Sequence, residues 1–155
     1  MDIMVTNPGV PAVTDELSIS TRLLEGKILC IDFDGTCVTH EYPRVGRFIG
    51  AEAVLLEFVQ QGAKLILWTM RSGKELEDAK TWFSDRHLPL FGVNENPDQK
   101  SWTLSQKAYA HLYIDDAALG APLCPGLLGE RPYMNWAAVR QLVLGGHDDL
   151  QPKPQ

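Results

Sequence analysis

Four short apolar segments recur along the chain, at residues 27–33, 64–69, 90–93 and 111–115. Each is followed by polar or turn-forming residues. Short continuous apolar runs of this kind are typical of parallel strands that are buried on both faces. The pattern therefore predicts four strands of a parallel sheet.

Helical periodicity occupies the intervals between these strands and the end of the chain. Residues 51–61 form one apolar face ahead of Gly62, and residues 72–75, Ser-Gly-Lys-Glu, have the form of a capping box that opens a second helix. A third helix is predicted over residues 133–144, and a helical turn over residues 103–108. The expected buried positions in the three helices are Val54, Leu55, Phe58 and Val59, then Leu76, Ala79 and Phe83, then Trp136, Val139 and Val143.

Strands that alternate with helices predict an α/β fold, here a three-layer, Rossmann-like parallel sheet. The chain of 155 residues fits one such domain. We expect this domain to span residues 27–145, with an N-terminal arm at residues 1–26 and a disordered polar tail at residues 146–155. All strands of a parallel sheet end at one edge, and open α/β sheets bind their ligands there.

Polar side chains follow three of the predicted strands at that edge. The first strand ends in Asp32 and is followed by Asp34, Thr69 ends the second, and the last ends in Asp115 and is followed by Asp116. Carboxylates gathered in a partly buried place are not stable without a cation or hydrogen bonds. The sequence therefore predicts a polar site at this edge of the sheet.

Taken in order, these residues resemble the four motifs of the haloacid dehalogenase-like (HAD) superfamily. Residues 32–36, Asp-Phe-Asp-Gly-Thr, match the first motif in full, and Thr69 matches the second. Lys107 matches the third motif, and residues 115–116, Asp-Asp, match the fourth. Residues 67–73, Leu-Trp-Thr-Met-Arg-Ser-Gly, are further similar to a group of small bacterial HAD hydrolases that lack a cap domain.

The resemblance implies a phosphomonoester hydrolase that forms an aspartyl-phosphate intermediate. Asp32 would be the nucleophile, and Asp34 would protonate the leaving oxygen and later activate water. Thr69 would donate a hydrogen bond to the phosphoryl oxygens, and Lys107 would neutralise the transferring group. Lys100 also precedes the last strand and is the alternative to Lys107.

Three further residues are expected to contact the substrate. Gly35 lets the backbone come close to a ligand, and Thr36 completes the first motif. Arg71 can bind a phosphate through two hydrogen bonds, although a salt bridge to Glu75 at the start of the helix explains it equally well.

The same resemblance implies a bound Mg²⁺ ion, which prefers oxygen ligands. Its protein ligands would be Asp32, the backbone carbonyl of Asp34, and one of the adjacent pair Asp115 and Asp116. We expect Asp115 to be the direct ligand of that pair, since adjacent carboxylates seldom both reach one metal.

The intervals between the motifs bear on access to the site. Neither the interval from Asp34 to Thr69 nor that from Thr69 to Lys107 leaves room for a folded cap. We expect an open site, and the resemblance implies a β-hairpin flap beside it at residues 40–47. His40 and Glu41 in this flap would either touch the substrate or be solvated loop residues, and we expect the second. An open site suits a phosphorylated macromolecule, or a phosphorylated small molecule if a homo-oligomer covers it.

Composition limits the class of protein. The net charge of −6 counts against nucleic acid and anionic membranes as partners, and no run has the length of a membrane span. The three cysteines do not form a disulfide framework, and no secretory signal is visible, so we expect a cytoplasmic protein. The alternatives are a nucleic-acid end phosphatase and a catalytically silent HAD-fold binding module.

Overall fold

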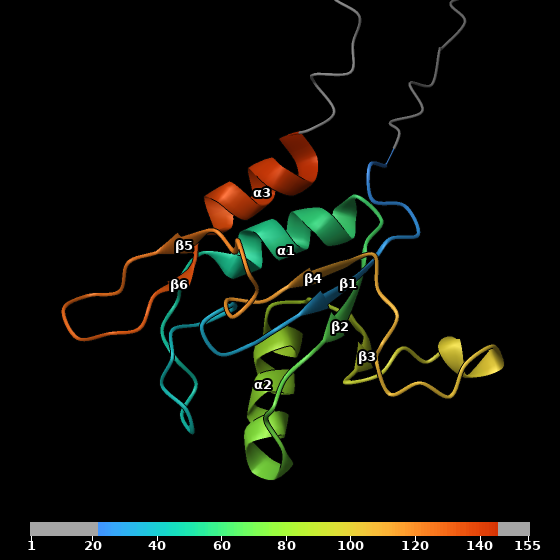
Figure 1. Ribbon diagram of the computed structural model, residues 1–155, viewed down its shortest axis with the longest axis horizontal. Helices are drawn as coiled ribbons and strands as arrows, with labels where there is room; N and C mark the ends of the chain where they lie inside the picture. The colour runs from blue at the N-terminus through green and yellow to red at the C-terminus, as the bar shows by residue number, and fades with distance from the viewer. Residues whose placement is uncertain (1–21, 146–155) are drawn as a thin grey trace, which may run out of the picture.

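A four-stranded parallel sheet in the order β3-β2-β1-β4 forms the centre of the molecule (Figure 1). Figure 1 is a computed structural model, in which residues 22–145 are described. The strands are β1 (Ile28–Ile31), β2 (Lys64–Leu67), β3 (Leu90–Val93) and β4 (Leu112–Ile114). Each lies within a segment predicted from the sequence, so the prediction of an α/β fold with a parallel sheet is confirmed. Residues 1–21 of the arm expected at residues 1–26, and the tail expected at residues 146–155, lie outside the described residues.

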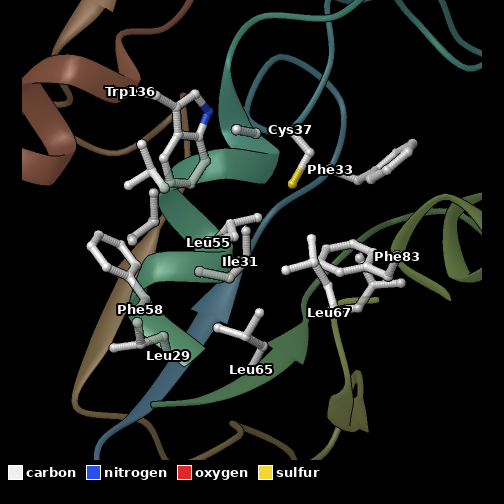
Figure 2. Close-up of a cluster of buried hydrophobic side chains, with 14 of the residues drawn as sticks. Leu29, Ile31, Phe33, Cys37, Leu55, Phe58, Leu65, Leu67, Phe83 and Trp136 are labelled. Carbon is white, nitrogen blue, oxygen red and sulfur yellow. The ribbon is translucent and has the colours of Figure 1, made fainter. Parts of the chain in front are cut away.

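All three helices pack on one face of this sheet. They are α1 (Ala51–Gln60), α2 (Gly73–Asp85) and α3 (Trp136–Leu144). The chain moves from β1 to β2 to β3 in one direction across the sheet, so right-handed crossovers place α1 and α2 on the same side. Figure 2 shows Leu29 and Ile31 of β1 beside Leu55 and Phe58 of α1, all fully buried. This apolar layer is the main core.

The opposite face of the sheet has no regular helix over it within residues 22–145. Cys30 and Ile66 point to this side and pack against Ala108 in the connection from β3 to β4. That connection contains only the three-residue 3-10 helix η1 (Gln99–Ser101). The third layer of the expected three-layer arrangement is therefore an irregular segment.

The helical turn predicted over residues 103–108 is wrong, and the side chain of Gln99 provides the reason. Its amide Nε2 donates to the carbonyls of Ser105 and Lys107, at 2.7 and 3.1 Å, and its Oε1 accepts from the backbone of Tyr109 at 2.7 Å. One buried side chain thus satisfies backbone groups that a helix would have paired with each other.

Two helix starts also differ from the prediction. Ser72 is the residue before α2, but its side chain makes no capping hydrogen bond, so the capping box is not formed. The third helix begins at Trp136 and not at residue 133, because β6 (Tyr133–Met134) pairs antiparallel with β5 (Leu123–Cys124). Asn135 then caps α3 by accepting from the backbone of Ala138 at 3.1 Å.

The segment at residues 39–47, called the flap below, follows β1 and folds back on itself. The backbone of Thr39 donates to the carbonyl of Arg47 at 3.1 Å, and the backbone of Arg47 donates to Thr39 Oγ1 at 2.8 Å. Val38 and Phe48 form an antiparallel bridge at its base. A hairpin-like flap is therefore present where the sequence predicted one.

The described part of the domain also includes residues ahead of β1. Leu24 is buried in the main core, and its backbone donates to the carbonyl of Gln61 at 3.0 Å. None of the helices within residues 22–145 is both long and apolar enough to cross a membrane.

Trp136 links α3 to the loop after β1, which leads to a stability prediction. Its side chain is 3% exposed, and Nε1 donates to the carbonyl of Thr36 at 2.6 Å. We expect Trp136→Phe to lower the free energy of unfolding by about 1–3 kcal/mol, because a buried carbonyl loses its partner. Urea denaturation measures this loss. Trp102→Phe is the matched control, since Trp102 is 66% exposed, and an equal loss there would contradict the explanation.

Candidate active site

The two strands that carry most of the acidic residues are neighbours in the sheet. β1 and β4 pair in parallel, and the backbone of Asp32 donates to the carbonyl of Ile114 at 2.9 Å. The chain leaves β1 toward β2 on one side, whereas β4 lies on the other side of β1. This reversal of strand order is the kind of place where open α/β sheets bind ligands.

Three carboxylates meet at this point and are called the acid cluster below. Asp32, Asp115 and Asp116 each offer one oxygen, and these oxygens lie within 4.8 Å of one another. All three residues are half-buried. The structure thus brings together three of the four aspartates that the sequence assigned to the site.

Thr36 connects two members of the acid cluster. Its hydroxyl donates to Asp32 Oδ2 at 2.8 Å and also lies 3.3 Å from Asp116 Oδ1. The backbone of Asp116 in turn donates to Thr36 Oγ1 at 3.0 Å. Thr36 is fully buried and bridges the two carboxylates.

The electrostatic environment of Asp32 differs from that of an ordinary carboxylate. Burial is the main reason that the pKa of Asp32 rises to about 7, and the Asp115 and Asp116 charges raise it further. The hydrogen bond from Thr36 lowers this pKa and so opposes the rise. A group of positive charge at the acid cluster would relieve the same cost.

Asp34 does not join the acid cluster but pairs with Arg71. Arg71 Nε donates to Asp34 Oδ2 and Nη2 donates to Asp34 Oδ1, both at 2.7 Å. The Arg71 side chain is 1% exposed, and Nη2 and Nη1 also donate to the flap carbonyls of Arg44 and Pro43, at 2.7 and 3.1 Å. Arg71 thus holds Asp34 and the flap together. The alternative of a salt bridge to the Glu75 carboxylate is wrong, since Arg71 reaches only the Glu75 backbone carbonyl at 3.4 Å.

His40 lies at the site, although the sequence favoured a solvated loop position for it over a contact with substrate. Its Nε2 lies 2.8 Å from Asp116 Oδ2, and its side chain is only 16% exposed. The expectation that His40 is a solvated loop residue is therefore wrong. The sequence feature that could have indicated this place is that His40 closely follows the first motif. Gly35 of that motif has no side chain, and a side chain there would collide with the His40 ring.

Thr69 lies at the same edge of the sheet, just beyond β2. Its hydroxyl oxygen accepts from the backbone of Arg71 at 3.1 Å, so its hydrogen is free to donate elsewhere. The Asn94 side chain pairs with the Thr69 backbone, accepting from N at 2.8 Å and donating to O at 2.9 Å. The end of β3 therefore fixes the end of β2.

Neither candidate lysine forms an ion pair with the acid cluster in the described part of the chain. Lys107 is exposed, and its Nζ lies 5.6 Å from the centre of the Tyr113 ring. Lys100 pairs with Glu95 at 3.1 Å on the surface. The choice between the two lysines is therefore not decided by contact with the aspartates.

Cys37 borders the site but is chemically quiet. It is fully buried, and burial raises the pKa of its thiol well above the usual value. Its sulfur donates to the carbonyl of Asp32 at 3.3 Å. Cys37 therefore acts as a small apolar residue of the main core.

A pocket opens beside His40 between the flap and the turn at residues 129–131. Its volume is about 210 Å³, and its lining includes Glu41, Arg47 and Arg131. A second cavity of about 680 Å³ runs along β4 and α3 and reaches Asp115, with mostly apolar walls. The first pocket is lined by His40 and by no member of the acid cluster, whereas the second cavity reaches the cluster at Asp115.

Comparisons with known proteins agree with the fold but name no activity. No family model matches the chain, and no curated protein does. A solved structure of a conserved protein from Bacteroides thetaiotaomicron is similar, with 28% sequence identity and a TM-score of 0.64. The match covers 82% of this chain and 98% of that one.

The raised pKa of Asp32 predicts a pH dependence of stability. Between the usual Asp pKa of 3.8 and about 7, the folded state keeps a proton that the unfolded chain has lost, so stability falls as pH rises through this window. In EDTA, we expect Asp32→Asn to gain stability relative to the wild type from about pH 4 to about pH 7 and then to level off. Urea denaturation across pH measures the difference. As a control, Asp98→Asn at an exposed position should leave the pH dependence of the free energy of unfolding unchanged. If the difference in this free energy between Asp32→Asn and the wild type does not vary with pH, the raised pKa of Asp32 is contradicted.

Proposed function

We propose that the protein is a Mg²⁺-dependent phosphomonoester hydrolase that works through an aspartyl-phosphate intermediate. The observation that carries the proposal is the acid cluster at the carboxyl ends of β1 and β4, with three oxygens within 4.8 Å. Carboxylate oxygens are the ligands that Mg²⁺ prefers, and a divalent cation offsets the repulsion among them. The motif resemblance described above supplies the reaction class.

Asp32 is the proposed nucleophile. Its Oδ2 accepts from Thr36, so the orientation of the carboxylate is set before substrate binds. A pKa near 7 would leave much of Asp32 protonated at neutral pH, and a protonated carboxyl is a poor nucleophile. When bound, Mg²⁺ supplies the positive charge that keeps Asp32 ionised and stabilises the phosphoryl group.

The remaining aspartates divide the ligand role. Asp115 Oδ1 accepts from the backbone of Ala117 at 2.8 Å, which leaves its second oxygen for a cation. Asp116 has His40 at Oδ2, and its Oδ1 faces the acid cluster, 3.3 Å from the Thr36 hydroxyl. Asp115 is therefore the first choice as the direct ligand of the pair, and Asp116 would face the cation through Oδ1.

Asp34 is the proposed acid and base, which would give a proton to the leaving oxygen in the first step and take one from water in the second. Both of its carboxylate oxygens accept hydrogen bonds from Arg71. A substrate phosphate would compete with Asp34 for the same guanidinium, so Arg71 remains a proposed substrate contact.

The substrate is proposed to be a phosphorylated small molecule or macromolecule. The pocket between the flap and residues 129–131 is small, at about 210 Å³, so larger leaving groups would extend into solvent or against a second subunit. The acidic balance of the chain counts against a nucleic-acid end.

A silent binding module is the second candidate, and the placement of Lys107 favours it. A phosphatase of this type uses a cation beside the nucleophile, whereas Lys107 lies near the Tyr113 ring and makes no ion pair with a described carboxylate. Turnover of an aryl phosphate separates the two candidates, because a module has none.

The first test of the proposal concerns the nucleophile. With Mg²⁺ and p-nitrophenyl phosphate, we expect Asp32→Asn to abolish turnover, because no covalent intermediate can form. Asp34→Asn should lower turnover through both chemical steps, while the exposed control Asp98→Asn should keep wild-type activity. Release of nitrophenolate measures all three. Wild-type activity in Asp32→Asn would rule out the covalent mechanism.

The second test concerns the metal. Activity should disappear in EDTA and return with Mg²⁺, and Mg²⁺ should raise the melting temperature because it binds only the folded acid cluster. Asp115→Ala should lose the thermal response. Full activity of the wild type in EDTA would remove Mg²⁺ from the mechanism.

A further inference from the structure

His40 joins the flap to the acid cluster through one contact. Its Nε2 lies 2.8 Å from Asp116 Oδ2, and the two side chains are 16% and 10% exposed. Since the Asp116 carboxylate accepts, Nε2 carries the hydrogen. Few water molecules can compete for a contact this well covered, so it has a defined geometry.

Gly35, which precedes the flap, leaves room for the His40 ring. Gly35 has a φ of +86°, and a Cβ there would lie 1.9 Å from His40 Nε2. The absence of a side chain at Gly35 therefore lets the ring approach Asp116. The turn itself is fixed, since the Gly35 backbone donates to Val38 and accepts from Met134, at 2.7 and 2.8 Å.

The contact decides which oxygen of Asp116 remains available. Oδ2 is occupied by His40. Thr36 has one hydroxyl hydrogen, which is directed to Asp32 Oδ2 at 2.8 Å in preference to Asp116 Oδ1 at 3.3 Å. Asp116 is thus held with Oδ1 toward Thr36 and the acid cluster, and with Oδ2 turned toward the flap.

We propose that His40 is a positioning residue for the cation site, which it completes by holding Asp116 in this orientation. The inference rests on the Mg²⁺ site of the proposed function. Groups that hold a metal-binding carboxylate in place reduce the reorganisation needed on binding, and their loss typically costs about 10–100-fold in metal affinity or activity. The flap therefore contributes to the metal site as well as to access.

A loss of Mg²⁺ affinity in a His40 variant could also come from a general loosening of the flap. A substitution at Arg47 distinguishes this explanation from loss of the contact between His40 and Asp116. Arg47 holds the flap from the outside, pairing with Glu41 at 3.2 Å and with Glu130 at 2.7 Å. Its side chain is 50% exposed, and its ion pairs are with Glu41 and Glu130 and not with the acid cluster. We expect Arg47→Ala to weaken the flap and to leave the contact between His40 and Asp116 in place.

The experiment is a calorimetric titration of the full chain with Mg²⁺ alone, without substrate. We expect His40→Ala to weaken Mg²⁺ binding by about tenfold or more. His40→Gln should recover most of the affinity, because its amide nitrogen can donate to Asp116 Oδ2. Arg47→Ala should bind like the wild type. The Mg²⁺-induced rise in melting temperature should follow the same order.

The outcomes separate the inference from the proposed function. Wild-type Mg²⁺ affinity in His40→Ala would overturn the positioning role of His40. A loss of Mg²⁺ affinity in Arg47→Ala as large as that in His40→Ala would overturn it too. Neither result would affect the proposed Mg²⁺ site. If His40→Ala fails to fold, His40→Gln tests the positioning role of His40 instead. A Mg²⁺ affinity near that of the wild type would support the role. A loss of Mg²⁺ affinity as large as that in Asp115→Ala would overturn it. Absence of Mg²⁺ binding in the wild type would overturn both proposals. Mg²⁺ binding that depends on His40, without turnover of any phosphate ester, would leave the inference standing and remove the hydrolase.

Discussion

The desolvated carboxylate of Asp32 is the constraint on which the rest of the site depends. It ends a buried strand beside two other carboxylates, and its pKa of about 7 records the cost of charging it there. Thr36 reduces this cost by donating a hydrogen bond to Asp32. His40 contacts the neighbouring Asp116. A divalent cation is the remaining partner that such a group of oxygens fits.

Hydrogen bonds from distant parts of the chain hold the loop after β1 in place. Met134 of β6 donates to Gly35, and Trp136 of α3 donates to Thr36. Arg71, which follows β2, fixes Asp34 and the flap carbonyls at the same time. Because these contacts come from β6, from α3 and from the short connection between β2 and α2, the polar groups are positioned before any ligand binds. This arrangement is what a catalytic site needs, although a rigid binding site needs it equally.

The sequence predicted the elements whose pattern is local. The strands and the first two helices lie where the apolar periodicity indicated, because burial of one face requires that periodicity wherever the element packs. The predictions that failed depended on side chains from elsewhere. Gln99 took the backbone groups of the expected turn at residues 103–108, and pairing of β6 with β5 delayed the start of α3. These partners lie outside any helical window.

The sequence by itself determined that carboxylates would end the first and last strands of a parallel sheet, since motif and strand are written in adjacent residues. Tertiary structure alone decided how they are used. It placed β4 beside β1, which made a cluster of Asp32, Asp115 and Asp116 and left Asp34 to Arg71. It also brought His40 onto Asp116, 76 positions away. The physical reason is that a carboxylate's partner is set by distances of about 3 Å in space, and chain separation carries no information about them.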